Sequence, residues 1–159
     1  MCVLFGDGAC AVVLKAVDNN TEDVTGALVG HERGIIDSNI YNDGTGASVL
    51  TGGRRFSDSC STDIFIHMDG QEVFKFAVKS VPTAIETLLH NNNMEINEVD
   101  KFILHQFPGN LNEYGYTSSA SIPILLDELN RNGSLKQGEK LVLAGFGAGL
   151  SWGSILLVW

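Results

Sequence analysis

The stretch KLVLAGFGAGLSWGSILLVW, residues 140–159, decides the fold. Residues 140–144 and residues 154–159 are apolar runs of strand length, and a glycine-rich turn separates them. Two strands that are joined by a tight turn pair antiparallel, because a parallel pair needs a long crossover connection. We therefore expect an antiparallel pair of strands at the end of the chain.

Immediately upstream, the sequence predicts a helix and another strand. Residues 118–130 place leucine and isoleucine at helical spacing, and Asn132-Gly133 is a typical stop signal. Residues 102–105 form a short apolar run that ends in a histidine. These patterns predict a buried strand followed, after a connection, by a helix that packs on the sheet.

A longer helix is expected before that strand. Asp69 is followed three residues later by Glu72, which is the pattern of a helix N-cap, and apolar residues then recur at helical spacing as far as Leu89. We expect Pro82 to kink this helix or to start a new segment, and the asparagine run 91–93 to end it.

The N-terminal third of the chain is less regular. Residues 9–17 are small and β-branched and predict a strand, while residues 18–62 read as a long loop that contains a short strand at 34–40. Residues 63–67 are expected to be an extended entry to the long helix. The order of elements predicts an α/β chain with a mixed sheet covered by helices.

Composition excludes several classes of function. The formal net charge is −9, with 10 Lys and Arg against 19 Asp and Glu, which argues against nucleic acids and against anionic membrane surfaces as partners. No apolar run reaches the roughly 18 residues of a membrane span, and the N-terminus lacks the basic region of a signal peptide. The odd cysteine count, Cys2, Cys10 and Cys60, predicts reduced thiols and a cytoplasmic location.

Two glycine motifs have a sequence pattern similar to that of nucleotide-binding loops. Residues 6–11 fit G-x-G-x-x-A, and Gly145, Gly147 and Gly149 follow a strand. A dinucleotide site needs a helix directly after the glycines, whereas strand patterns follow both motifs here, so we do not expect one. Close backbone packing is the favoured role for the first motif, and an exposed backbone N–H that stabilises an oxyanion is an alternative role for such glycines.

Among the four histidines, His105 is the candidate for chemistry. It ends an apolar strand, where side chains line the active-site crevices of many α/β proteins, and a histidine there can donate a hydrogen bond or move a proton. A structural role in the core fits the pattern equally well. No histidine or cysteine spacing indicates a metal site.

Five stretches, in order, resemble the type III β-ketoacyl-(acyl carrier protein) synthases, which have a thiolase-like fold. They are residues 4–9 (LFGDGA), 68–77 (MDGQEVFKFA), 102–106 (FILHQ), 117–123 (TSSASIP) and 145–154 (GFGAGLSWGS). The resemblance covers the C-terminal half of that family. It implies that residues 1–159 form a C-terminal half-domain and that the half with the nucleophilic cysteine is absent. The chain also begins inside a strand pattern, so we expect a missing upstream part.

The resemblance implies a function and a set of site residues. The family condenses an acyl-CoA thioester with malonyl-acyl carrier protein and releases carbon dioxide, with no cofactor. His105 matches a histidine that binds the malonyl thioester carbonyl, and Ala148 matches a backbone oxyanion donor, flanked by Gly147 and Gly149 as substrate-binding positions. Tyr116 stands where the family has an asparagine, and its larger side chain argues against an unaltered decarboxylation step.

A second departure from the family lies after Gln106. Eight residues, Phe107–Tyr114, separate Gln106 from Gly115, too few for a crossover helix, which needs at least about 10 residues. The resemblance therefore implies that one crossover helix is deleted and that one face of the sheet is left uncovered. We expect the isolated chain to be inactive.

Three further interpretations stay open from the sequence. The chain could be a non-catalytic interaction module that forms a homodimer or pairs with a separate N-terminal half. It could be a half of a related condensing enzyme that starts polyketide chains. The weakest alternative is a hydrolase that uses Cys10 as nucleophile and His105 as base.

Overall fold

The computed structural model describes residues 5–16, 33–53, 65–105 and 114–159. Its helices and strands agree closely with the expected elements from residue 34 onward, with one exception. They are β1 (Gly34–Asn42), β2 (Leu50–Gly53), β3 (Phe65–Met68), α1 (Gly70–Asn91), β4 (Lys101–Leu104), α3 (Ser121–Arg131), β5 (Lys140–Gly147) and β6 (Ser151–Val158), with short 3-10 turns at Gly44–Gly46, Ile96–Glu98 and Ser118–Ala120. The exception is β2, which lies in residues that the sequence predicted as loop; its pairing with β3 makes it a strand.

A mixed sheet forms the centre of the molecule. Its strand order is β1-β6-β5-β4, in which β4 and β5 run parallel and the other neighbours run antiparallel. β5 and β6 pair along their whole length, from Lys140 opposite Val158 to Gly147 opposite Ser151, which confirms the expected antiparallel pair. β2 and β3 form a separate antiparallel pair at the N-terminal end of α1.

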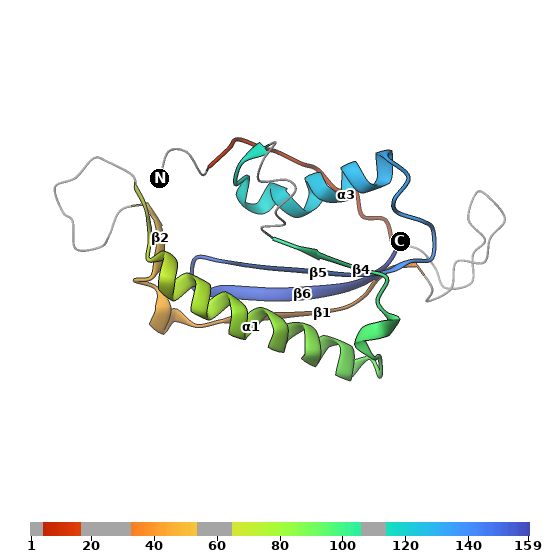
Figure 1. Cartoon of the computed structure of the whole chain (residues 1–159), viewed down its shortest axis with the longest axis horizontal. Coiled ribbons are helices and arrows are strands. Elements are labelled where there is room, and N and C mark those ends of the chain that lie inside the picture. Colours follow the sequence, from red (N-terminus) through yellow and green to blue (C-terminus); the bar gives the residue numbers. More distant parts are fainter. Residues whose placement is uncertain (1–4, 17–32, 54–64, 106–113) are drawn as a thin grey trace.

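The two helices cover opposite faces of this sheet (Figure 1). Strand side chains alternate between the faces, since successive residues of a strand point to opposite sides. On the α1 face, Leu88 and Leu89 of the helix pack with Val142 of β5 and Leu156 of β6. This cluster forms half of the core.

The α3 face carries the other half of the core. There Leu125 of the helix packs with Ile103 of β4 and with Leu141 and Leu143 of β5. In β4, β5 and β6 the odd-numbered core residues therefore face α3 and the even-numbered ones face α1. His105 continues the odd-numbered series of β4, which directs its side chain toward α3.

Two further expectations about local structure are wrong. α1 runs through Pro82 as one helix, so Pro82 does not start a new segment; apolar residues on both sides of it, Val81 and Ile85, pack in the core. Residues 9–16 form no strand, although their sequence favours one. The reason is that a strand needs a hydrogen-bonding partner, and the described residues offer none along this segment apart from a single bridge at Phe5.

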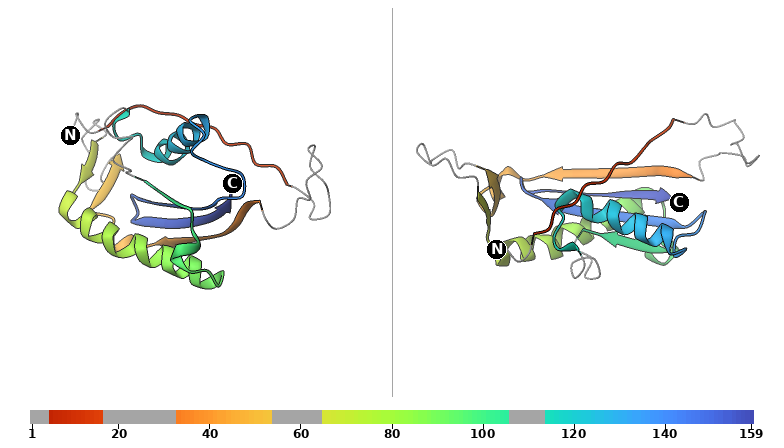
Figure 2. Two further views of the ribbon diagram at one scale, coloured as in Figure 1. Left: turned by 45° about the vertical axis from the view of Figure 1, so that its right-hand side comes forward. Right: turned by 90° about the horizontal axis from the view of Figure 1, so that it is seen from above.

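Part of the α3 face is not covered by α3. Seen from above, residues 5–16 cross this face between α3 and β1 (Figure 2). A hollow of about 930 Å³ lies there, and its walls include Leu14, Ile40, Leu126, Leu157 and Trp159. An apolar area is thus left open on this face, as the resemblance implied. The proposed deletion itself concerns residues 106–113, which lie outside the described residues.

Candidate functional site

His105 lies directly after β4, and the parallel pairing of β4 with β5 fixes its place. Its backbone N–H donates to the Ala144 carbonyl over 2.9 Å, which extends the ladder by one residue. The carboxyl ends of the two parallel strands therefore meet at one edge of the sheet, where active-site residues gather in α/β folds. The side chain of His105 is partly buried at this edge.

Tyr116 approaches His105 from the connection that precedes α3. Its hydroxyl contacts Nε2 of His105, and the two rings meet edge to face with centroids 5.0 Å apart. The sequence predicted both residues as site residues, and the structure brings them together. The resemblance implied that His105 and the residue at position 116 would bind the same substrate oxygen. In the structure, His105 and Tyr116 contact each other.

The first glycine motif and the preceding Phe5 also contact Tyr116. The Gly6 N–H donates to the Tyr116 carbonyl over 3.1 Å, and the Phe5 ring packs edge to face on the Tyr116 ring at 5.2 Å. A Cβ on Gly6 would collide with the carbonyl oxygen of Tyr114. The favoured role of close backbone packing thus agrees with the structure, with residues 114–116 as the packing partner.

An aromatic chain connects the site to α1. The Phe146 ring of β5 lies edge to face against His105 at 5.7 Å and against Phe76 of α1 at 6.1 Å. Phe76 in turn contacts Trp152, which stacks on Tyr41. The rings of Phe146 and Tyr116 thus limit the rotation of the His105 imidazole.

Burial sets the protonation of His105. Removal of the imidazole from water disfavours its charged form and lowers the pKa of His105 below its ordinary value. The ring is therefore neutral at physiological pH. A neutral imidazole has one N–H donor and one acceptor nitrogen, so the site can donate a hydrogen bond or accept a proton but does not supply a fixed positive charge.

A hydroxyl that the sequence analysis missed completes the surroundings of His105. Oγ of Ser121, the first residue of α3, lies 2.6 Å from Nδ1 of His105. Serine at the start of a helix is common as a capping residue, so the sequence pattern offers no signal that separates this serine from its neighbours. Only the packing of α3 against β4 shows the contact.

The glycine turn between β5 and β6 is open to solvent. Ala148 and Gly149 are exposed, Gly147 is partly buried, and an added Cβ at Gly147 would meet no atom within 4 Å. The turn begins two residues after Phe146, whose ring contacts His105. Contacts within the chain do not test whether Ala148 donates to a substrate oxygen, so its role as a backbone donor stays a prediction.

The structure does not support a cysteine–histidine pair. Cys10 is exposed, and its thiol donates weakly to the Ala120 carbonyl over 3.9 Å instead of contacting His105. Cys2 and Cys60 lie outside the described residues. Within the described parts of the chain, no three His, Cys, Asp or Glu side chains gather closely enough to hold a metal ion. None of the described helices is long and apolar enough to cross a membrane.

Comparisons with known proteins agree on one family. Residues 106–159 match the family described as 3-oxoacyl-[acyl-carrier-protein (ACP)] synthase III C terminal. β-Ketoacyl-[acyl-carrier-protein] synthase III of Clostridium acetobutylicum is 37% identical over 183 aligned positions, which cover 99% of this chain and 52% of the relative. The same enzyme of a Synechococcus strain is 40% identical over 179 positions and covers 99% of this chain and 51% of the relative.

The structural comparison gives the same family. The crystal structure of β-ketoacyl-[acyl carrier protein] synthase III from Thermus thermophilus superposes with a TM-score of 0.70 at 31% identity and covers 80% of this chain and 46% of that chain. The chain thus spans about half the length of the relatives it matches. Both sequence alignments are longer than the chain's 159 residues, so each relative has residues without a counterpart here. Along its whole length, the chain is related to the C-terminal half of β-ketoacyl-[acyl-carrier-protein] synthase III, a thiolase-like condensing enzyme of fatty acid biosynthesis.

Proposed function

We propose that this chain supplies the histidine-bearing half of a decarboxylating condensing enzyme and that it needs a cysteine-bearing half to act. The proposal rests on the contact between His105 and Tyr116 at the carboxyl end of β4. This contact places two groups that can donate hydrogen bonds at one point, beside the aromatic wall of Phe146. An acyl-CoA thioester and malonyl-acyl carrier protein are the proposed substrates, and the cytoplasm is the proposed location.

The chemistry that such a pair can support is the formation of an enolate. When the carbon–carbon bond to the malonyl carboxylate breaks, carbon dioxide leaves and the electron pair moves onto the thioester oxygen. Hydrogen bonds to that oxygen in a water-poor site lower the energy of the charged state. The enolate carbon then attacks the acyl group on the cysteine of the other half, the new carbon–carbon bond forms, and the cysteine thiolate leaves.

Tyr116 changes the geometry of this step. A phenol donates a single hydrogen bond, and its oxygen lies at the end of a rigid ring that also contacts His105. We therefore propose that the carbonyl oxygen binds at the Tyr116 hydroxyl with His105 behind it, in place of two donors side by side. The turn at Ala148 would supply the backbone donor for the acyl oxyanion.

The test uses the N-terminal half of the Synechococcus enzyme, fused ahead of this chain or mixed with it. Carbon dioxide release from malonyl-acyl carrier protein and formation of the β-ketoacyl product are measured. We expect no activity from the chain alone, activity from the fusion, and a loss of about 100-fold or more in His105→Ala, since one oxyanion donor contributes that much. His90→Ala, an exposed change at the C-terminal end of α1, is the matched control. Condensation by the chain alone, or full activity of His105→Ala in the fusion, would refute the proposal.

A second candidate function, a non-catalytic binding module, is favoured by the surface of residues 12–14. Val12, Val13 and Leu14 are 67%, 94% and 75% exposed, and Val12 and Leu14 border the hollow on the α3 face. Apolar surface of this kind marks contacts with another chain. The two candidates share the pairing with an N-terminal half, and they differ in whether the fusion condenses its substrates.

A further inference from the structure

The imidazole of His105 is held at both nitrogens by hydroxyl groups. Nδ1 lies 2.6 Å from Oγ of Ser121, and Nε2 contacts the hydroxyl of Tyr116. The two hydroxyls come from different elements, since Ser121 begins α3 and Tyr116 precedes the 3-10 turn at Ser118–Ala120. Neither contact depends on a residue outside this chain.

Packing prevents the ring from turning away from these partners. Phe146 and Tyr116 present their rings edge to face to the imidazole. Behind it, Gly145 has no side chain, and a Cβ at that position would lie 3.4 Å from Cβ of His105. In this orientation, the position of the proton on one or the other ring nitrogen decides which hydrogen bonds His105 donates and accepts.

The relative acidity of the two hydroxyls decides which nitrogen of His105 carries the proton. A tyrosine hydroxyl has a pKa near 10, far below that of an aliphatic alcohol such as serine, and is therefore the better hydrogen-bond donor. A neutral imidazole offers one acceptor nitrogen and one N–H. The arrangement of lowest energy has the Tyr116 hydroxyl donating to Nε2, while the Nδ1–H donates to Oγ of Ser121.

We propose that Ser121 is a positioning residue that holds His105 in the Nδ1–H tautomer and thereby presents Nε2 to Tyr116 as an acceptor. The link to catalysis rests on the proposed function above, whereas the tautomer is a property of this chain alone. In the resting site Nε2 cannot donate to a substrate oxygen. Donation requires the other tautomer: Nε2 takes the hydroxyl proton of Tyr116 while Nδ1 gives its proton to Oγ of Ser121, which releases its own hydrogen to solvent, and solvent returns a proton to the Tyr116 oxygen. Each hydrogen bond then runs in the opposite direction, with the Ser121 hydroxyl donating to Nδ1. Only a residue that both accepts and donates at this position allows the two directions.

The test reads the tautomer directly by NMR of the full chain labelled with nitrogen-15 in its histidine rings. His105→Gln assigns the signals, and spectra are recorded at a pH where the ring is neutral. We expect the unaltered chain to show one tautomer, with the proton on Nδ1. Ser121→Ala should give a mixture of both tautomers, and Ser121→Thr, which keeps the hydroxyl, should restore the single Nδ1–H form.

Two outcomes overturn the inference: an Nε2–H tautomer in the unaltered chain, or a spectrum of His105 that Ser121→Ala leaves unchanged. If Ser121→Ala does not fold, as judged by its amide spectrum, the unaltered chain and Tyr116→Phe still decide. Tyr116→Phe removes the donor to Nε2 and leaves a serine hydroxyl that can accept from Nδ1–H or donate to Nδ1, so it should give a mixture of both tautomers; a single Nδ1–H form in this variant would refute the argument from relative acidity.

Failure of this inference is distinguishable from failure of the proposed function. The NMR measurement needs neither substrate nor a second half of the enzyme. If His105 has the expected tautomer but the fusion does not condense its substrates, the proposed function fails alone. If the fusion is active and His105 carries its proton on Nε2, the positioning role fails alone.

Discussion

At the scale of single residues, the burial of His105 has a consequence for stability. The lowered pKa means that the unfolded chain binds a proton at His105 more readily than the folded chain does. The contribution of His105 to stability is therefore fully present above its unfolded pKa, near 6.5, and decreases as the pH falls below that value.

We accordingly predict that the unaltered chain loses stability between pH about 7.5 and pH about 5.5 and that His105→Gln, which cannot titrate, loses less over this range. The midpoint of urea denaturation at the two pH values measures the effect. His67→Gln, an exposed change on β3, serves as the control and should keep the pH dependence of the unaltered chain. If the urea midpoint changes with pH by the same amount in His105→Gln and in the unaltered chain, burial of the imidazole does not contribute to the pH dependence.

At the scale of elements, α1 depends on its N-cap. The Asp69 carboxylate accepts hydrogen bonds from the backbone N–H groups of Gln71 and Glu72, both over 3.1 Å. The first turn of a helix otherwise leaves these donors without intrahelical partners.

Asp69→Ala should therefore destabilise the chain by about 1 kcal/mol, whereas Asp69→Asn, which keeps a capping oxygen, should cost only a fraction of that. Chemical denaturation followed by circular dichroism measures both. A loss in Asp69→Asn as large as in Asp69→Ala would mean that the charge of Asp69, and not the cap, stabilises α1.

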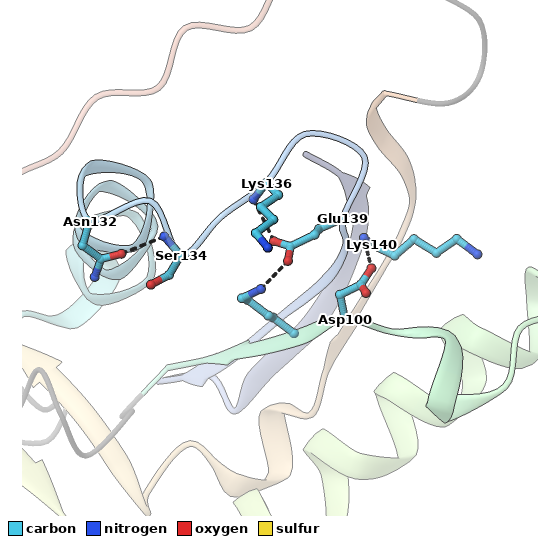
Figure 3. A network of polar contacts seen from close by, with 7 residues as sticks. Asp100, Asn132, Ser134, Lys136, Glu139 and Lys140 are labelled. Carbon is cyan, nitrogen blue, oxygen red and sulfur yellow. Dashed lines mark hydrogen bonds and ion pairs between the residues drawn. The ribbon is translucent and has the colours of Figure 1, made fainter.

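A network of polar contacts holds the start of β5 to β4 (Figure 3). Glu139 accepts from Nζ of Lys101 over 2.6 Å and from the backbone N–H of Lys136 over 2.9 Å, and Asp100 accepts from the backbone N–H of Lys140 over 2.8 Å. The hydrogen bond from Lys101, with a smaller part from the Lys136 N–H, lowers the pKa of Glu139 below its ordinary value.

Because the folded chain holds Glu139 ionised more strongly than the unfolded chain does, its contribution is present above the unfolded pKa and is lost as the pH falls through the folded value. We predict that Glu139→Gln lowers the melting temperature at pH about 7 and that the difference from the unaltered chain decreases as the pH is lowered toward about 3. Glu86→Gln, an exposed change on α1, is the control. A difference that persists unchanged in acid would exclude the ion pair as its cause.

At the scale of the whole molecule, the chain leaves apolar surface unpaired. The segment around Val13 has a strand-like sequence without a strand partner among the described residues, and the hollow beside it is lined by side chains of β1, β6 and α3. Exposed surface of this size favours association.

We predict that the isolated chain associates with itself at high concentration and that an added N-terminal half competes with this association. Val13→Glu should weaken both contacts without changing the fold, since the Val13 side chain is almost fully exposed. Sedimentation velocity over a range of concentrations gives the measurement. If the chain is a monomer at every concentration and does not bind the N-terminal half, a binding role for this surface is excluded.

The sequence predicts those elements that local residue patterns specify, and it fails for those that depend on tertiary contacts. The strands β4, β5 and β6, helix α3 and the cap of α1 were predicted because local apolar periodicity and capping chemistry specify them. Residues 9–16 were predicted wrongly because a strand forms only when a partner is present, and that partner is not specified by the segment itself. Pro82 was overestimated as a breaker because tertiary packing holds the helix together around it.

The sequence by itself determined the α/β class, the final antiparallel pair and the family resemblance, since each is encoded in residue types at fixed spacing, and the resemblance implied the choice of His105 and Tyr116. The tertiary structure alone decided that these two side chains touch, that Ser121 holds the other nitrogen of the imidazole, and that the α3 face stays open beside β1. Such features depend on the distance between elements that are far apart in the chain. That distance is set by the packing of whole helices on a sheet, which no local pattern records.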